Sequence, residues 1–158
     1  NVVLEVSATP YLYSLRFYDW LRRDHRQRQR AVHVDHAFAN LDDRRQGRAV
    51  TDELIQAPRR LRGGSEWHEE LLGSAPEMFF EVRRHVVAPG SAAEDDTAGR
   101  FHVLNVVEGE GVAVETATGA RHDLAYAETI VVPAHVGPYR LRNLGQRQAR
   151  LVKALVRP

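Results

Sequence analysis

The C-terminal half of the sequence is a series of short apolar segments separated by turn residues. Pro89-Gly90, Thr118-Gly119 and Leu144-Gly145 are typical of these turns. Short, β-prone segments at such regular spacing are typical of an all-β sandwich or barrel. The segments predicted as strands are residues 77–87, 101–107, 111–116, 128–133, 139–144 and 149–156, and residues 91–99 are predicted to be a mobile loop.

The N-terminal third has a weaker pattern. Residues 2–6 and 11–21 are rich in β-branched and aromatic side chains and are predicted as strands. Residues 22–30 form a charged, solvated connection. Residues 31–41 fit a strand that runs into a helical turn, and "VTDELI" fits a short helix capped by Thr51.

Composition and charge narrow the class of protein. The chain has 158 residues, of which 43% are apolar, enough for one domain or one domain plus part of another. No apolar run approaches the roughly 18 residues of a membrane span. The net charge of +1 gives no basic field for nucleic acid. The chain has no cysteine, which excludes disulfides and thiolate metal sites and predicts a cytoplasmic protein.

Two stretches resemble the cupin barrel. "VVEGEGVAVE" reads as a strand that enters a glycine hairpin at residues 108–111, where glycine permits positive φ. "AETIVVPAHVG" reads as a strand followed by a proline turn. The fold prediction is therefore an all-β, cupin-type jelly-roll barrel with short helical or irregular connections, a superfamily with many functions.

The N-terminal part resembles one family within this superfamily, the small bacterial class I mannose-6-phosphate isomerases. The matching blocks are Val3-Leu4-Glu5-Val6, Arg16-Phe17-Tyr18-Asp19 and "RAVHVDHAFANLD" at residues 30–42, and "AETIVVPA" follows in the family's order. Residues 47–99 match only loosely. The resemblance implies a protein that interconverts mannose 6-phosphate and fructose 6-phosphate with zinc.

The same resemblance implies that the zinc ligands lie upstream of Asn1, in a first cupin domain. Residues 1–62 would then be the tail of that domain with a connecting segment, and residues 63–158 the C-terminal cupin barrel. The start of the chain, "NVVLEVS", has no methionine and reads as the inside of a strand, so a piece of a longer protein is expected. On its own this piece is predicted to be inert, to need no cofactor and to support the catalytic barrel.

Arg16 is the main candidate for a catalytic residue. Isomerisation of a sugar phosphate moves a proton between C1 and C2 and needs cations for the phosphate. In the family that the chain resembles, the basic residue at this position faces the phosphorylated sugar, and Asp19 is its predicted partner. The alternative is a structural salt bridge from Arg16 to Asp19 or Glu5.

A metal site in the C-terminal barrel is not predicted. Cupin metals use a His-x-His pair, a nearby glutamate and a later histidine, but residues 91–107 contain only His102. His135 lies in the proline turn itself and is predicted to be a turn residue at the barrel mouth. His33 and His36 lack a third ligand, and His68 lies beside two glutamates without zinc-type spacing.

A second function class stays open, a non-catalytic cupin that binds a sugar or an effector. The content of the barrel mouth separates the two readings, because a binding module needs converging polar groups whereas a supporting domain is filled by Val, Leu and Phe. Arg140 and Arg142 lie two apart on one strand face and could bind an anion, although a solvated face is the simpler interpretation. Exposed strand edges near the N-terminus also predict that two copies could pair as a homodimer.

Overall fold

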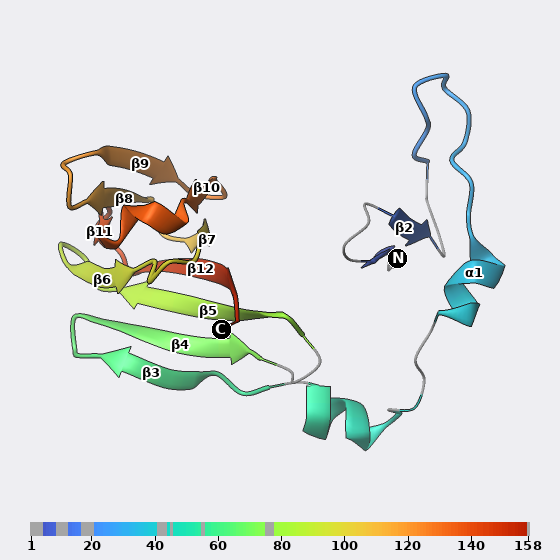
Figure 1. Ribbon diagram of the computed structural model, residues 1–158, viewed down its shortest axis with the longest axis horizontal. Coiled ribbons are helices and arrows are strands. Elements are labelled where there is room, and N and C mark those ends of the chain that lie inside the picture. Colours follow the sequence, from blue (N-terminus) through green and yellow to red (C-terminus); the bar gives the residue numbers. More distant parts are fainter. Residues whose placement is uncertain are drawn as a thin grey trace. The chain divides into compact units, whose positions relative to one another are not determined.

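The computed structural model describes residues 5–8, 13–16, 21–40, 44, 46–54, 56–74 and 78–157. The chain divides into two compact units, Asn1–Val50 and Thr51–Pro158 (Figure 1). The division into residues 1–62 and 63–158 that the resemblance implies stays a prediction. No helix in the described part of the chain is both long and apolar enough to cross a membrane.

The described residues of the first unit form a two-stranded antiparallel sheet and helix α1, and a second short helix begins at its last residue. Strand β1 (Glu5–Ala8) pairs with β2 (Tyr13–Arg16). Strand β1 overlaps the strand predicted at residues 2–6, and β2 lies within the strand predicted at residues 11–21. Helix α1 (Val34–Ala39) confirms the helical turn predicted for residues 31–41, but residues 31–33, directly before it, are not a strand. A short helix, η1 (Val50–Leu54), confirms the "VTDELI" prediction; it begins at Val50, so Thr51 lies inside the helix and does not cap it.

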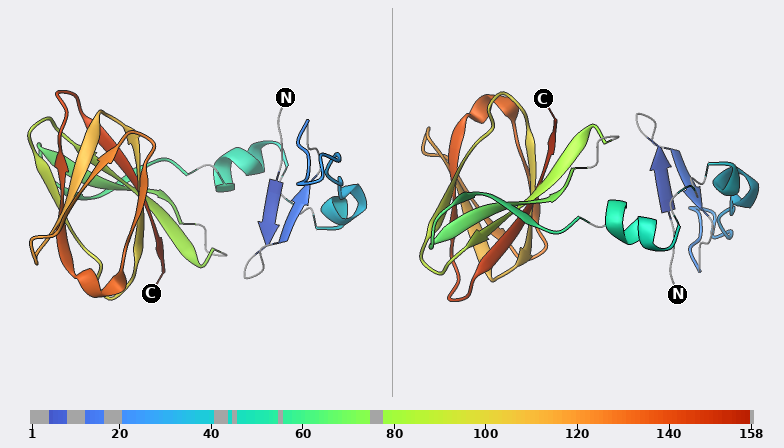
Figure 2. Two further views of the ribbon diagram at one scale, coloured as in Figure 1. Left: turned by 90° about the horizontal axis from the view of Figure 1, so that it is seen from above. Right: turned by 90° about the horizontal axis from the view of Figure 1, so that it is seen from below.

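The second unit is built from two antiparallel sheets. The larger has the strand order β10-β7-β12-β5-β4-β3 and the smaller β6-β11-β8-β9. Figure 2 shows the two sheets curving around a common interior. The larger sheet contains β3 (Arg59–Gly63), β4 (Trp67–Gly73), β5 (Phe80–Val87), β7 (His102–Glu108), β10 (Thr129–Val132) and β12 (Ala149–Val156). The smaller contains β6 (Ala92–Asp96), β8 (Gly111–Thr116), β9 (Arg121–Ala125) and β11 (Pro138–Asn143).

The predicted all-β architecture is confirmed, with one correction. All six segments predicted as strands in the C-terminal half contain strands. The prediction of a loop at residues 91–99 is wrong, because β6 pairs with β11 across residues 92–96. Alternation of the side chains between the two faces of each strand places an apolar core between the sheets. Its largest completely buried members include Leu104, Val106, Val112, Leu141 and Leu151.

The turn between β3 and β4 depends on Gly63. Its φ is +112°, and a Cβ there would meet the carbonyl oxygen of Trp67 and lie 2.5 Å from Cα of His68. The neighbouring Gly64 has open space at the same position. We expect Gly63→Ala to lower the free energy of unfolding by more than about 1 kcal/mol and Gly64→Ala to change it much less. Urea unfolding of the two variants measures this, and equal effects would contradict the assigned turn geometry.

Candidate functional site

A cluster of polar and charged side chains lies inside the barrel, at one end of the apolar core. Each of its members occupies an inward-facing position of its strand, and together they come from six strands of both sheets. All are less than a tenth exposed, although most are of types that globular proteins keep at the surface. The members of this buried cluster are Glu69, His85, Asp95, His102, Tyr139 and Lys153.

Lys153 provides the positive charge at the centre of the buried cluster. Its ammonium nitrogen Nζ lies 2.6 Å from Oε1 of Glu69 and 2.5 Å from Oδ2 of Asp95. The side chain of Lys153 is 1% exposed, so water contributes little to the solvation of this charge. Two carboxylates and one ammonium therefore stabilise one another at a site where burial of any one of these charges alone would be costly.

Asp95 receives hydrogen bonds from three further side chains. Nε2 of His85 lies 2.9 Å from Oδ2, the hydroxyl of Tyr139 donates to the same oxygen over 3.0 Å, and Nη2 of Arg62 donates to Oδ1 over 2.8 Å. Burial by itself would raise the pKa of Asp95. The hydrogen bond from His85 and the charge of Lys153 outweigh it and hold the pKa well below its usual range.

Arg62 connects the buried cluster to the surface. Its guanidinium bonds to Glu69 through Nε at 2.6 Å and to Asp95 through Nη2, and it lies 5.3 Å from the centre of the Trp67 ring. The side chain is 42% exposed, while the carboxylates that it joins are almost completely buried. Burial would raise the pKa of Glu69, but Lys153 and the other cations lower it, so Glu69 is also ionised.

Two histidines of the buried cluster are held in the neutral form. Burial lowers the pKa of His85, and burial together with the charge of Lys153 lowers the pKa of His102 to about 4. Nδ1 of His102 lies 2.8 Å from the hydroxyl of Tyr139. Because that hydroxyl donates its proton to Asp95, Nδ1 of His102 carries the hydrogen that completes the chain from His102 through Tyr139 to Asp95.

Three members of the buried cluster are of types that could hold a metal ion, but Lys153 already lies against two of them. Glu69, His85 and Asp95 offer ligand atoms within 4.8 Å of one another, and carboxylate and imidazole are groups that zinc uses. Nε2 of His85, however, is bonded to Asp95, and the ammonium of Lys153 lies against both carboxylates. A cation bound to both carboxylates would compete with Lys153, whereas Nδ1 of His85 has no hydrogen-bond partner among the described residues.

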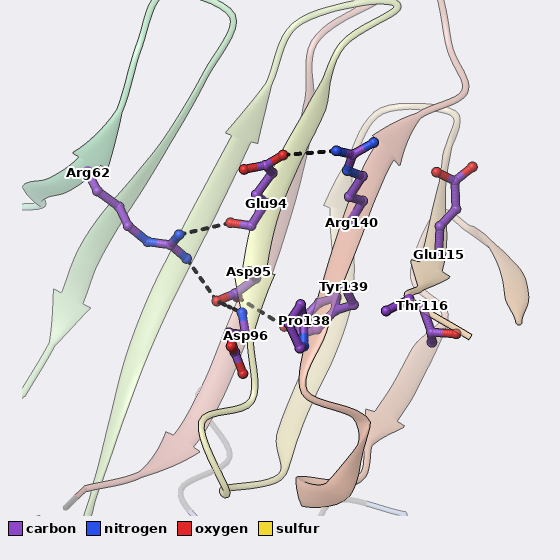
Figure 3. Close-up of a pocket in the computed structure, with 10 residues that line it drawn as sticks. Arg62, Glu94, Asp95, Asp96, Glu115, Thr116, Pro138, Tyr139 and Arg140 are labelled. Atoms are coloured by element: carbon purple, nitrogen blue, oxygen red, sulfur yellow. Dashed lines mark hydrogen bonds and ion pairs between the residues drawn. The ribbon is translucent and has the colours of Figure 1, made fainter. Parts of the chain in front are cut away.

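A groove on the outside of the smaller sheet lies next to the buried cluster. Its volume is about 620 Å³. Figure 3 shows Glu94, Arg140 and Glu115 on adjacent strands, with Arg62 reaching from β3 toward Asp95 and the backbone oxygen of Glu94. The residues that line the groove include four acidic ones, Glu94, Asp95, Asp96 and Glu115, and two arginines, Arg62 and Arg140.

The structure tests the predicted roles of some of the candidate residues and leaves others untested. Arg16 lies in β2, but its side chain is outside the described residues, and so is the whole of Asp19, so their roles stay predictions. His135 is exposed in the single turn η2 (Ala134–Val136), which confirms that it is a turn residue. Arg140 and Arg142 bond to Glu94 and Glu115 on an outer sheet face, as the simpler interpretation expected.

The sequence did not indicate the buried cluster. His102, the single histidine of residues 91–107, is 2% exposed and bonded to Tyr139. No carboxylate lies where a cupin glutamate was sought, but Asp95 and Glu69 supply two from β6 and β4. One signal was present: Lys153 is the only lysine in the chain, and it interrupts the apolar positions Leu151 and Leu155 at the spacing of an inward strand face.

Solved structures share this arrangement of two facing antiparallel sheets. The cupin-2 domain of an XRE-family transcriptional regulator from Enterobacter cloacae matches with a TM-score of 0.51 and 18% identity, over 60% of this chain and 99% of that one. A cupin-2 domain protein from Rhodospirillum rubrum matches with a TM-score of 0.53 and 15% identity, over 64% of this chain and 70% of that one. The barrel has the cupin fold.

The other comparisons identify no particular family or function within this fold. KdgF from Halomonas has a TM-score of 0.50 and 13% identity, over 61% of this chain and 85% of that one. No protein-family model matches the sequence, and no curated protein matches it. At these identities the likeness shows the cupin fold alone, and none of it points to mannose-6-phosphate isomerase in particular.

Proposed function

We propose that this cupin barrel is a non-catalytic module that binds a small, neutral, hydroxyl-rich ligand such as a sugar, and that it works without a metal ion. The observation that carries the proposal is the buried cluster, in which the ammonium of Lys153 lies between Glu69 and Asp95. The positive charge that a metal ion would bring to two carboxylates is already supplied by the chain.

The accessibility of the ionisable groups supports a non-catalytic role. A general base must come within hydrogen-bond reach of the proton that it removes. Glu69, His85 and Asp95 are buried, and both carboxylates and Nε2 of His85 are bonded to groups of the protein. If the chain is the C-terminal region of a protein like mannose-6-phosphate isomerase, we propose that aldose–ketose isomerisation takes place elsewhere and that this barrel supports or regulates it.

The charges of the groove favour a neutral ligand over a phosphorylated one. Four acidic residues line the groove, although the carboxylate of Asp95 is already bonded within the buried cluster, and both of its arginines are bonded to acidic residues: Arg62 to Glu69 and Asp95, and Arg140 to Glu94. A phosphate in the groove would therefore lie near more negative charge than unpaired positive charge. Sugar hydroxyls can donate to the carboxylates and accept from the guanidinium groups without bringing a charge of their own.

A titration of the full chain with mannose and with mannose 6-phosphate, followed by two-dimensional NMR, tests the proposal. We expect mannose to shift signals of residues in the groove, and Arg140→Gln to weaken this binding severalfold. Arg147→Gln is the matched control, because Arg147 is an exposed arginine at a different pocket and also pairs with a glutamate, Glu110. We also expect no fructose 6-phosphate from mannose 6-phosphate, with or without added zinc.

Two results would overturn the proposal. Zinc-dependent formation of fructose 6-phosphate by this chain would make the barrel catalytic. Binding of mannose 6-phosphate with no detectable binding of mannose would show that the groove recognises the phosphate, contrary to the charge argument.

A further inference from the structure

Another pocket lies at the opposite end of strand β8 from the groove. Gly109, at this pocket, comes shortly before the first residue of β8, whereas Thr116, the last residue of β8, lines the groove. The volume of the pocket is about 320 Å³. Small-molecule sites occupy about 300–1,000 Å³. We call it the β7 pocket, and the residues that line it are Val107, Glu108, Gly109, Tyr126, Arg147 and Gln148.

The β7 pocket lies over the end of strand β7, between the two neighbours of that strand in the larger sheet. Val107 belongs to β7, Tyr126 lies in the turn that leads into β10, and Gln148 comes directly before β12. Val107 is 41% exposed and Tyr126 is 63% exposed. The pocket therefore has an apolar floor and an aromatic wall, and Arg147 and Gln148 form the opposite, polar wall.

The turn that carries Tyr126 is held in a strained conformation. Ala127 has a φ of +65°, a value that residues other than glycine rarely adopt. Its amide donates to the carbonyl oxygen of Val106 over 2.8 Å. The side-chain amide of Asn105 donates to the carbonyl oxygens of Ala127 and Glu128, over 3.2 Å each. Strained backbone of this kind persists only where its surroundings fix it, and such residues cluster at binding and active sites.

A second asparagine fixes the polar wall of the pocket. Nδ2 of Asn143 donates to the carbonyl oxygen of Arg147 over 2.7 Å and to that of Val87 over 3.1 Å. Oδ1 of Asn143 accepts a hydrogen bond from the amide of Gly145 over 2.9 Å. Asn143 is 4% exposed, so water competes little for these bonds. Because both walls are fixed without a ligand, binding would require little further ordering of the protein.

We propose that the β7 pocket binds the base of a purine nucleotide, with one face of the base on Tyr126 and its edge toward Arg147, Gln148 and Glu108. Proteins stack bases on aromatic side chains and on guanidinium planes, and both kinds of group line this pocket. The inference does not rest on the proposed function, because the groove is a separate site for a ligand without an aromatic ring.

The distribution of polar groups in the pocket favours a base over a sugar. A base carries its hydrogen-bonding groups on its edge and none on its faces. It can therefore lay a face on the ring of Tyr126 without losing a hydrogen bond. A sugar carries hydroxyls around its whole rim and would turn some of them toward Tyr126 and Val107, where they would find no partner.

The polar side chains match the edge of guanine in particular. Guanine presents the acceptors N7 and O6 and, beside them, N–H donors. Arg147 and Gln148 can donate to these acceptors, and Glu108 can accept from the donors. Both charges have partners in the protein: Arg147 lies 3.6 Å from Glu110, and Glu108 lies 2.7 Å from Arg150. The pocket therefore has no unpaired charge for a phosphate, and the base provides the recognition.

Titration of the full chain with guanosine 5′-monophosphate (GMP), followed by two-dimensional NMR, tests the proposal. We expect the signals of Tyr126 and Gln148 to shift, with a dissociation constant of about 0.1–1 mM. Tyr126→Ala should weaken GMP binding about tenfold, because the stacked face is lost, whereas Tyr126→Phe should change it less than about twofold. Ribose 5-phosphate, which has no base, should bind at least about tenfold more weakly than GMP.

Phe101→Ala is the matched control for Tyr126→Ala. Phe101 is an aromatic residue that is 45% exposed, and it lies directly before β7, at the end of the strand away from the pocket. We expect its replacement to leave GMP binding unchanged, and circular dichroism checks that each variant is folded. Mannose should leave the signals of Tyr126 unchanged, so this titration and that of the groove can fail separately.

Three results would overturn the proposal. They are no shift of the Tyr126 signals at about 10 mM GMP, equal binding of GMP by Tyr126→Ala, and equal affinities for GMP and ribose 5-phosphate.

A single-stranded hexanucleotide with guanine at every other position identifies the source of the base. An affinity close to that of GMP would support a free nucleotide. An affinity at least about a hundredfold higher, which falls as salt is added, would support a base within a single strand.

Discussion

Replacing Lys153 by methionine is expected to lower the free energy of unfolding at pH 7 by about 3–5 kcal/mol, because removal of one partner leaves buried charge uncompensated. The ammonium of Lys153 lies within 2.6 Å of both Glu69 and Asp95, and methionine fills its space without the charge. The two carboxylates would then repel each other in a site that is almost closed to water. Urea unfolding followed by circular dichroism measures the loss.

Arg150→Met is the matched control for Lys153→Met. Arg150 lies on the same strand, β12, and forms a salt bridge of 2.7 Å with Glu108, but both side chains are more than a third exposed. Solvent screens such a pair, so we expect a loss of less than about 1 kcal/mol. Similar losses for the two variants would mean that the buried cluster is no more important to stability than a surface ion pair.

The stability of the wild-type chain is expected to fall as the pH is lowered from about 6.5 to 4. The native pKa of His102 is about 4, whereas the ordinary value is 6.5, so within this window the unfolded chain binds a proton that the native chain does not. At about 1.4 kcal/mol per pKa unit, His102 alone contributes a loss of about 3 kcal/mol across the window. The lowered pKa of His85 acts in the same direction.

The carboxylates of the buried cluster steepen this acid sensitivity at lower pH. The pKa values of Asp95 and Glu69 are held below the ordinary values of 3.8 and 4.5, so their contribution is lost as the pH falls below those values. Urea midpoints measured between pH 7 and 4 check the prediction. His102→Gln keeps a donor for Tyr139 but cannot titrate, and it should flatten the dependence between pH 6.5 and 4. A wild-type stability that is constant or rises over this range would contradict the assignment of neutral, buried histidines.

The strands that sequence reasoning found are those with one apolar face. In β12, the alternation of Ala149, Leu151 and Leu155 with outward residues is visible in the sequence, and the glycine hairpin before β8 marks where the strands turn. The strands that it missed have polar residues on both faces. In β6, Asp95 points into the buried cluster while Glu94 lies on the charged outer face, so "AAEDD" shows no apolar period and its sequence predicts a loop.

The buried cluster could not be assembled from spacing for a related reason. Glu69 and Lys153 are separated by most of the barrel's sequence and meet only because β12 and β4 both flank β5. Histidine motifs are typical of barrels in which a metal supplies the positive charge. They cannot indicate a barrel in which a lysine supplies that charge. The single lysine among many arginines was the available signal, since a compact ammonium fits between two carboxylates where a planar guanidinium would need more room.

Elemental analysis of the purified wild-type chain, before and after incubation with zinc and removal of the excess, is the most direct test of the central claim that Lys153 supplies the positive charge of this cupin barrel. We predict no stoichiometric metal in either sample. One zinc ion per chain, lost in a His85→Gln variant that still folds, would contradict the account, because it would show that the buried cluster binds a metal ion in the native protein.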